Sequence, residues 1–365
     1  MNKPIKVLQM ISSLYCGGSQ MMVMNLYKNI DKSKVQFDFV VDHPEYKELL
    51  PIVEEYGGKV YTVPAFNGFN LFEVIKAWNK LFIDHPEYKI LHSHTRSYAS
   101  IYLPIARKHK VKTIIHSHNT SNGKKKNAIF KAILQYPLRF VSDYYMACSV
   151  DAGKWLFGDG IVNSNKFNVL YNAIDYKKFE FNKKIRDKYR KDFNIGNKTV
   201  YIQVGSFSEQ KNHSFTLNLF SEILKKKNDC FLVLVGDGEY RNDIEKQIEQ
   251  LSLKENVMLL GKRDDVASLL MMADCYLMPS VFEGLSVAAI EAQASGITCL
   301  LSDTVSKDVK IADFVEFLPL DINTWLDKCL NKFDRNNIQK NDDYLKYNIL
   351  NSVKWLEKYY ENIIR

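Results

Sequence analysis

Short apolar runs alternate with stretches of helical spacing along most of the chain, and few polar residues interrupt the runs. Parallel strands that are covered on both faces have this pattern. The runs lie at Lys6–Ile11, Gln36–Val41, Lys59–Val63, Ile90–His92, Thr113–His116 and Tyr144–Ala147 in the first half, and at Thr199–Val204, Phe231–Val235, Val257–Leu260, Cys275–Met278 and Ile297–Leu301 in the second.

The two halves begin with the same order of elements. In the first half, Gly17-Gly18 follows the opening strand and precedes a helical pattern from Met21 to Tyr27. In the second half, Gly205-Ser206 follows a strand and precedes a helical pattern from Phe215 to Leu224. Strand, glycine-containing turn and helix open a doubly wound domain. The sequence therefore predicts an α/β protein with two Rossmann-like domains.

The domain boundaries are expected near two changes of composition. A Lys-rich run that is poor in apolar residues begins at Tyr176 and reads as a solvated connection or helix. The last 22 residues have helical spacing, with Trp355, Tyr359 and Tyr360 as aromatic anchors. We expect an N-terminal domain at 1–175, a C-terminal domain at 176–343, and a helix at 344–365 that packs back on the N-terminal domain.

Composition and charge narrow the class of protein. The 365 residues carry 50 Lys and Arg against 42 Asp and Glu, so the net charge of +8 suits an anionic partner without choosing one. The six cysteines form no C-x-x-C pair, which argues against a disulfide framework or a zinc site. The first residues make a poor signal peptide, and no run is long enough to span a bilayer. We expect a cytoplasmic protein.

Two glutamates flank the start of one helical pattern. Glu283 lies in a loop after the strand that ends at Met278, and Glu291 lies about one and a half turns into the following helix. The positive end of that helix, at the carboxyl edge of a sheet, suits a phosphate group, and carboxylates pair well with sugar and ribose hydroxyls. The helix is otherwise almost uncharged, so a solvated face explains Glu291 poorly. The segment is a candidate sugar-nucleotide site.

Four segments resemble the retaining glycosyltransferases of family 4, in the branch of bacterial exopolysaccharide and capsule synthesis. They are Gly17-Gly18-Ser19, His116-Ser-His118-Asn119-Thr-Ser121, Val204-Gly-Ser-Phe-Ser-Glu-Gln-Lys211-Asn-His213, and the segment Phe282 to Gly296 with its E-x7-E motif. The resemblance implies the GT-B fold, in which two Rossmann-like domains face each other across a cleft. It also implies sugar transfer from a nucleotide-sugar, most often a UDP-sugar, to a hydroxyl of a glycan or lipid-linked acceptor. Configuration would be retained.

The resemblance also implies roles for individual residues. Glu291 would hold the donor's ribose, Glu283 would contact the transferred sugar, and Lys211 would neutralise the leaving pyrophosphate. His118 would lie near the reacting sugar. The donor-binding set would further include Gly17, Gly18, Phe282, Gly284, Leu285 and Ser286.

One position departs from the family pattern. Ser206 stands where the family often has Arg, which removes a bidentate phosphate contact. Arg263 is a candidate to compensate near the nucleotide. The resemblance implies no cofactor and no divalent metal, so charge stabilisation would fall to Lys211 and the helix end. Two alternatives remain: a sugar-nucleotide epimerase of the same fold, and a catalytically silent subunit of a polysaccharide complex.

Two H-x-H pairs, His92/His94 and His116/His118, each follow a strand. Residues two apart share a face of a strand, so four imidazoles could meet at one point and chelate a metal. No Asp, Glu or Cys cluster accompanies them, so a metal is disfavoured. A histidine facing a ligand at the carboxyl edge of the sheet is the preferred interpretation. The sequence does not separate His116 from His118 on its own, and we favour His118.

Two further segments carry weaker signals. Gly236-Asp-Gly238 lacks the third glycine of a dinucleotide loop, which leaves a tight strand-to-helix turn as its interpretation. The basic, partly amphipathic segment Lys124–Arg139 is either a solvated helix with a core face or a contact with an anionic membrane surface. The lipid-linked acceptors of the family favour the membrane contact, at the inner face of the plasma membrane. No array typical of nucleic-acid binding is present, so no nucleic-acid partner is expected.

Overall fold

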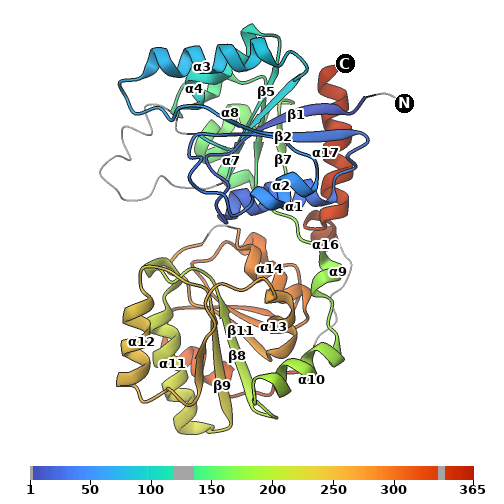
Figure 1. Ribbon diagram of the computed structural model, residues 1–365. Helices are drawn as coiled ribbons and strands as arrows, with labels where there is room; N and C mark the ends of the chain where they lie inside the picture. Colours follow the sequence, from blue (N-terminus) through green and yellow to red (C-terminus); the bar gives the residue numbers. More distant parts are fainter. Residues whose placement is uncertain (1–2, 97, 119–134, 284, 336–341) are drawn as a thin grey trace. The chain divides into compact units, whose positions relative to one another are not determined.

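The chain forms two compact units in a computed structural model (Figure 1). The first unit comprises Met1–Ala173 and Ile349–Arg365, and the second comprises Ile174–Asn348. The structure describes all residues except 1–2, 97, 119–134, 284 and 336–341. None of the described helices is long and apolar enough to cross a membrane.

The first unit is built on a parallel sheet of seven strands in the order β3-β2-β1-β4-β5-β6-β7. From β1 the chain adds strands β2 and β3 on one side and then β4 to β7 on the other side. This change of side at β1 is typical of a doubly wound fold. Its strands are β1 (Ile5–Met10), β2 (Val35–Val41), β3 (Val60–Thr62), β4 (Ile90–Ser93), β5 (Lys112–Ser117), β6 (Tyr144–Ala147) and β7 (Phe167–Val169). The edge strand β7 was missing from the sequence prediction, because its partly buried Phe-Asn-Val lacks a continuous apolar run.

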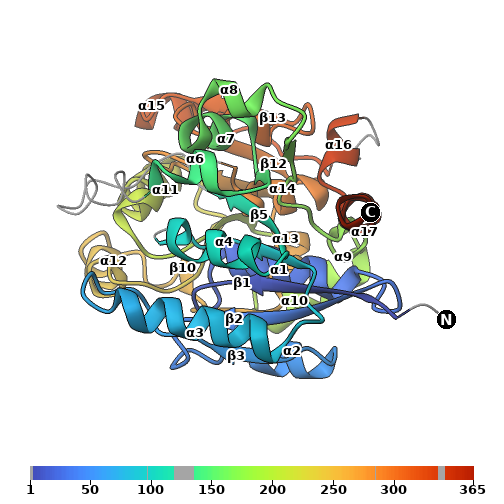
Figure 2. The same ribbon diagram turned by 90° about the horizontal axis from the view of Figure 1, so that it is seen from above.

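Helices cover both faces of this sheet. They are α1 (Gly18–Asn29), α2 (Leu50–Glu55), α3 (Leu71–Asp84), α4 (Ala99–Lys108), α6 (Leu138–Val141), α7 (Val150–Phe157), α8 (Asp159–Val162) and α17 (Ile349–Ile364). Figure 1 shows α3 and α4 on one side of the strands and α1 and α2 on the other, and the view from above agrees (Figure 2). The buried apolar residues accordingly form two clusters, one on each face.

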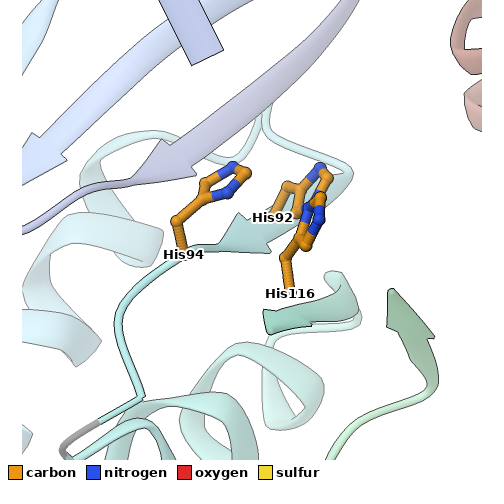
Figure 3. A group of neighbouring side chains, drawn as sticks. All are labelled: His92, His94 and His116. Atoms are coloured by element: carbon orange, nitrogen blue, oxygen red, sulfur yellow. The ribbon is translucent and has the colours of Figure 1, made fainter. Parts of the chain in front are cut away.

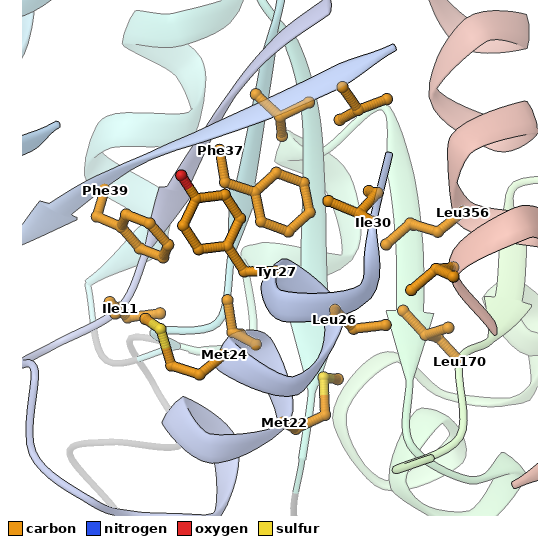
Figure 4. Packing of buried hydrophobic residues seen from close by; sticks show 14 of the residues in the cluster. Ile11, Met22, Met24, Leu26, Tyr27, Ile30, Phe37, Phe39, Leu170 and Leu356 are labelled. Atoms are coloured by element: carbon orange, nitrogen blue, oxygen red, sulfur yellow. The ribbon is translucent and has the colours of Figure 1, made fainter. Parts of the chain in front are cut away.

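Helix α17 is part of the first unit although it lies at the end of the chain. Its buried side chains Leu356, Tyr360 and Ile363 join the cluster that contains Tyr27 and Phe37 (Figure 4). Tyr360 meets Phe37 edge to face, with ring centroids 6.2 Å apart. The apolar stripe of α17 is thereby removed from water, as expected for an amphipathic helix on the surface of a domain.

The boundary before α17 differs from the expected one. The structure divides the chain after Asn348, so residues 344–348 belong to the second unit and not to the terminal helix. Tyr344 stacks on Tyr176 at 3.9 Å between ring centroids, and the Tyr347 hydroxyl donates to the Asp308 carbonyl at 2.8 Å. The first boundary falls after Ala173, two residues before the expected position.

The second unit contains a parallel sheet of six strands in the order β10-β9-β8-β11-β12-β13. The strands are β8 (Thr199–Val204), β9 (Cys230–Val235), β10 (Val257–Leu259), β11 (Cys275–Met278), β12 (Thr298–Ser302) and β13 (Val315–Leu318). The α-helices are α9 (Tyr176–Phe179), α10 (Lys183–Asp192), α11 (His213–Lys226), α12 (Arg241–Gln250), α13 (Val266–Met272), α14 (Val287–Ala294), α15 (Ile322–Cys329) and α16 (Asp342–Lys346), and the 3-10 helices are η1 (Glu209–Lys211) and η2 (Lys307–Val309). The Lys-rich run that begins at Tyr176 is therefore largely helical.

Two arginines, Arg186 in this Lys-rich region and Arg335 after α15, donate hydrogen bonds to carbonyls at the end of α13. The last turn of α13 has no basic residue of its own. Arg186 donates to the Met272 carbonyl at 2.8 Å, and Arg335 donates to the Met271 carbonyl at 2.8 Å and the Ala273 carbonyl at 2.6 Å. Helix ends leave carbonyls without internal partners, and charged donors from other elements satisfy them here.

We expect Arg335→Met to lower the free energy of unfolding of the second unit by about 3 kcal/mol, because buried carbonyls lose charged donors. The measurement is equilibrium denaturation of both variants and the parent protein. Lys332→Met is the matched control, since Lys332 is exposed and its ion pair with Asp334, at 3.5 Å, lies on the surface. Equal stability of the two variants would contradict the assigned role of Arg335.

Candidate functional site

The Glu283 loop is held in place by its backbone. It connects β11 to α14, and Glu283 forms an isolated parallel bridge with Val305. The Ser306 amide donates to the Glu283 carbonyl at 3.1 Å. The Thr304 hydroxyl donates to the Ser280 carbonyl at 2.8 Å. The segment after β12 therefore supports the loop from one side and fixes where the Glu283 side chain begins.

Lys211 and Glu283 form an ion pair across 72 positions of sequence. The Lys211 Nζ lies 2.6 Å from Glu283 Oε2, and both side chains are mostly buried. Gln210 Nε2 donates to the same carboxylate oxygen at 3.2 Å and to the Phe282 carbonyl at 3.0 Å. A cation and an anion that are shielded from water interact more strongly than a surface pair. Gln210 is a member of this group that the sequence prediction missed.

Two buried hydrogen bonds position Lys211. Gln203, in β8, donates from Nε2 to the Lys211 carbonyl at 2.7 Å. The Thr216 hydroxyl donates to Gln203 Oε1 at 2.6 Å, which fixes the orientation of that amide. Asn212 then leaves η1 with φ 53° and donates from Nδ2 to the Pro279 carbonyl at 3.1 Å. The loop after β8 is thereby tied to the loop after β11.

Glycines allow the loops after β8 and β9 to approach each other. A Cβ on Gly205 would lie 3.0 Å from Lys211 Cε, so the lysine stem packs against this glycine. A Cβ on Gly236 would lie 1.9 Å from the Gly205 carbonyl oxygen, and one on Gly238 would lie 2.3 Å from the Phe207 carbonyl oxygen. Gly236 and Gly238 therefore serve close packing of main chain, as a tight turn requires.

Glu291 lies in the second turn of α14 in apolar surroundings. Burial raises the pKa of Glu291 to about 7, and the charge of Lys178 in α9 acts weakly in the opposite direction. Ser286 is the N-cap residue before this helix, and its buried side chain makes no capping hydrogen bond. A carboxyl group with a pKa near 7 is present in both the protonated and the ionised form at neutral pH, so it can donate a hydrogen bond to a hydroxyl or accept one from it.

The remaining expected donor-site residues of the second unit are less closely connected to this pair. Phe282 is exposed and Leu285 is partly buried. Ser206 is exposed, and its hydroxyl lies 3.3 Å from that of Ser208. Arg263 is engaged by Asp265 through contacts of 2.8 Å and 2.6 Å, so a phosphate would have to compete for it. Gly284 lies outside the described residues.

In the first unit, Gly17 and Gly18 lie at the start of α1. Gly17 is the N-cap, and a Cβ on Gly18 would meet nothing within 4 Å. Neither glycine has a positive φ. Their backbone conformation therefore does not demand glycine, and the free space around Gly18 suits the approach of a ligand to the main chain.

The four histidines of the H-x-H pairs form a compact array (Figure 3 shows three of them). They form two hydrogen-bonded pairs, each with one histidine from either H-x-H pair. His92 Nε2 lies 3.2 Å from His116 Nδ1, and His94 Nδ1 lies 2.9 Å from His118 Nε2. Within each H-x-H pair the rings stack, at 4.4 Å between His92 and His94 and 4.2 Å between His116 and His118. His92 and His116 lie in β4 and β5, and His94 and His118 directly follow these strands, so that side chains two apart remain on the same side.

A metal ion fits this array poorly. Ligand nitrogens of His92, His94 and His116 lie within 4.8 Å of one another. A zinc ion would need about 2.0–2.1 Å to each nitrogen. The stacked rings of His92 and His94 are inclined by only 24°, so their in-plane lone pairs do not converge on one point. The hydrogen bonds also place protons between ring nitrogens that a metal would have to displace.

Burial lowers the pKa of all four histidines, to about 3 for His92 and His118. The charge of Arg96 contributes to the shift at His118. His116 is fully buried, whereas His118 is partly exposed, which favours His118 as the residue that meets a ligand. Arg96 itself lies over the Trp155 ring at 4.9 Å, and the sequence prediction missed it.

Comparison with known proteins agrees with this geometry. Residues 16–178 match the model "Glycosyltransferase Family 4", and residues 185–315 match the model "Glycosyl transferases group 1". A putative glycosyltransferase, EpsF of Bacillus subtilis, is 31% identical over 309 residues, which are 83% of this chain and 80% of EpsF. The chain belongs to glycosyltransferase family 4.

Other similar proteins place the family 4 chain among GT-B proteins. An Escherichia coli UDP-Gal:alpha-D-GlcNAc-diphosphoundecaprenol alpha-1,3-galactosyltransferase is 26% identical over 224 residues, 56% of each chain. The crystal structure of Anabaena Alr3699/HepE in complex with UDP matches with a TM-score of 0.75 and 15% identity, covering 97% of this chain and 95% of that one. The two parallel-sheet Rossmann-like units are those of the GT-B fold, and the protein is a glycosyltransferase.

The raised pKa of Glu291 predicts a pH-dependent stability. Folded Glu291 keeps its proton up to about pH 7, whereas an unfolded Glu loses its proton near pH 4.5. The free energy of unfolding of the parent protein should therefore decrease as the pH rises from 4.5 to 7. Between pH 4.5 and pH 7, Glu291→Gln should gain stability relative to the parent protein, by at most about 3 kcal/mol, since one pKa unit corresponds to about 1.4 kcal/mol.

Chemical denaturation at several pH values measures this difference. The exposed Glu255→Gln is the matched control and should show no such trend. A stability difference between Glu291→Gln and the parent that is constant with pH would contradict the raised pKa.

Proposed function

We propose that this glycosyltransferase moves a sugar from a UDP-sugar to a hydroxyl of a glycan or lipid-linked acceptor, with retention of configuration, in exopolysaccharide or capsule-type synthesis. The observation that carries the proposal is the buried Lys211–Glu283 pair beside the helix that presents Glu291. The similarity to EpsF, a putative glycosyltransferase, supports sugar transfer, and the exopolysaccharide or capsule role rests on the family resemblance of the four sequence segments. The fold shared with UDP-bound HepE and the partial similarity to a galactosyltransferase named for a UDP-sugar and a diphospholipid support the donor and acceptor classes.

The proposed roles follow from charge and position. Glu291 binds the ribose hydroxyls, and Glu283 binds hydroxyls of the transferred sugar. Lys211 stabilises the negative charge that develops on the leaving diphosphate, together with the amino end of α14. Glu283 neutralises this lysine, so the cation is largely shielded from water and held beside the loop. In the first unit, Gly17, Gly18 and His118 contact the sugar nucleotide.

The reaction proposed for these residues needs no protein nucleophile. The bond between the anomeric carbon and the diphosphate oxygen breaks, and the acceptor oxygen bonds to the same carbon on the same face. The acceptor's proton passes to the leaving phosphate oxygen. Lys211 and main-chain amides supply the charge stabilisation, and no divalent metal or cofactor takes part.

Removal of either member of the ion pair should impair transfer strongly. We expect Lys211→Met and Glu283→Gln each to lower kcat/KM by about 100-fold to 1,000-fold, the effect of losing one preorganised electrostatic contact. The measurement is nucleoside diphosphate release from a panel of nucleotide-sugars, with and without membrane lipid acceptor. Glu255→Gln serves as the control and should retain activity.

The same assay separates the alternatives. Acceptor-dependent release of diphosphate supports transfer, whereas isomerisation of the donor without acceptor would identify an epimerase. Absence of turnover in the parent protein with every donor would identify a silent subunit. EDTA should leave the rate unchanged, and a loss that Mg²⁺ restores would contradict the metal-free reaction.

The proposal includes contact with an anionic membrane surface at the inner face of the plasma membrane. Most of the segment Lys124–Arg139 lies outside the described residues. Its described end exposes aromatic side chains: Tyr136 is 59% exposed and the nearby Phe140 is 67% exposed, with Arg139 over the Tyr136 ring. Apolar rings beside basic groups suit the boundary between lipid headgroups and acyl chains.

The double variant Tyr136→Ser, Phe140→Ser should reduce co-flotation with vesicles that contain anionic phospholipid by about tenfold, because two apolar anchors are lost. Tyr46→Ser, which removes another exposed aromatic ring of the first unit, is the control and should float like the parent protein. Unchanged flotation of the double variant, or equal binding to purely zwitterionic vesicles, would contradict this contact.

A further inference from the structure

The histidine array is connected to one buried glutamine. Gln9, in β1, is 1% exposed and reaches the array with both ends of its side-chain amide. Its Oε1 lies 2.9 Å from His94 Nε2, and its Nε2 lies 3.3 Å from the Tyr360 hydroxyl. Two chains of hydrogen bonds therefore start at Gln9, and the direction of each bond follows from the amide.

The first chain runs from Gln9 through His94 to His118. An amide oxygen only accepts, so His94 must carry its proton on Nε2. A neutral imidazole has one proton, which leaves His94 Nδ1 as an acceptor. The bond of 2.9 Å to His118 Nε2 then requires the proton on His118 Nε2. His118 Nδ1 is consequently a bare lone pair.

The second chain runs from Gln9 through Tyr360 and His92 to His116. The amide nitrogen donates to the Tyr360 oxygen, so the Tyr360 hydroxyl is free to donate to His92 Nδ1 at 2.7 Å. His92 then carries its proton on Nε2 and donates to His116 Nδ1 at 3.2 Å. His116 in turn carries its proton on Nε2.

Both chains end at buried atoms. Neither His118 Nδ1 nor His116 Nε2 has a hydrogen-bond partner among the residues that the structure describes. The first chain ends in an acceptor and the second in a donor, on rings stacked 4.2 Å apart. A buried polar atom without a partner costs free energy, which a bound polar group can recover.

The polarity of the first chain follows the orientation of the Gln9 amide, and that of the second chain also depends on the Tyr360 hydroxyl donating to His92. A reversed Gln9 amide would make His94 an acceptor at Nε2 and Tyr360 a donor toward Gln9, and every later bond would reverse. All four histidines would then carry their protons on Nδ1, and His118 would present a donor. One amide orientation thus selects between two self-consistent sets of tautomers.

The assigned tautomers require each imidazole to be neutral, with a single proton, and the buried surroundings favour the neutral form. Burial disfavours the charged form of each ring, and the charge of Arg96 adds to this at His118. A ring that resists protonation to this degree is a poor general base. It can still orient a hydroxyl by accepting its hydrogen bond.

We propose that Gln9 and Tyr360 are positioning residues that hold the four histidines as Nε2–H tautomers, so that His118 Nδ1 accepts a hydrogen bond from a sugar hydroxyl. The tautomer assignment stands on the hydrogen-bond geometry, and the role of His118 toward a sugar rests on the proposed function. Because Tyr360 lies in α17, the end of the chain takes part in setting the polarity of a group that β4 and β5 carry.

The test reads the tautomers directly by ¹⁵N nuclear magnetic resonance of protein labelled at its eight histidines. A ring nitrogen that carries a proton and one that does not have well-separated shifts. At pH 7, His92, His94, His116 and His118 should all be neutral with the proton on Nε2. Nδ1–H tautomers at these four residues, or charged rings, would overturn the proposal.

Variants separate the two chains of hydrogen bonds. Tyr360→Phe should let His92 and His116 populate both tautomers while His94 and His118 keep the proton on Nε2. Gln9→Leu should release all four. Tyr359→Phe is the matched control, since it removes the adjacent hydroxyl of α17 and should leave the four tautomers unchanged. An unchanged spectrum in both Tyr360→Phe and Gln9→Leu would overturn the positioning role.

Kinetics connect the array to transfer. Gln9→Leu should lower kcat/KM for the donor by about tenfold, the size of one misoriented hydrogen bond. A wild-type rate in Gln9→Leu with mixed tautomers would overturn the role of His118 toward the sugar. If the parent protein transfers no sugar, the proposed function fails, whereas the tautomer assignment still stands or falls by the spectrum.

Discussion

The proposed donor site of this glycosyltransferase depends on the close approach of two loops in the second unit. The Lys211–Glu283 pair forms because the loops after β8 and β11 meet, at 2.6 Å between their charged atoms. Asn212 ties one loop to the other, and the bridge at Val305 supports Glu283 from behind. If either loop shifted, one of the two charges would remain buried without its partner. An unpaired buried charge lowers the free energy of unfolding more than the loss of a surface ion pair does.

Glycines allow the loop after β8, which carries Lys211, to pack closely. Gly205 leaves room for the Lys211 stem, and Gly236, after β9, leaves room for the main chain at Gly205. A side chain at either position would displace the loop that carries Lys211. The absence of Arg at Ser206 matters less in this setting, because the lysine is already held by Gln203 and Glu283.

The first unit holds four imidazoles together in surroundings that favour their neutral form. Pairing across β4 and β5 and stacking along each strand satisfy most ring nitrogens within the array. Gln9 and Tyr360 close the other ends. The two atoms left over belong to His116 and His118, and only the second ring retains exposed surface.

Several features were predictable because they depend on local order along the chain. Apolar runs predicted most strands, and the E-x7-E spacing identified the loop and helix that carry Glu283 and Glu291. The edge strands β7 and β13 escaped prediction: Phe167–Val169 and Val315–Leu318 are short and only partly buried, so they lack the continuous apolar pattern. The division after Asn348 also escaped, because it depends on Tyr344 stacking on Tyr176 from a distant part of the chain.

By itself, the sequence determined the α/β class, the two-unit organisation and the residue types of the site, because burial periodicity and motif spacing are local properties. Only the tertiary structure decided that Lys211 pairs with Glu283, 72 positions further along the chain. It also decided which histidine nitrogens remain open, since that depends on Gln9 and on Tyr360, 351 positions away. Such contacts arise from the folding of distant segments onto one another, and no local pattern encodes them.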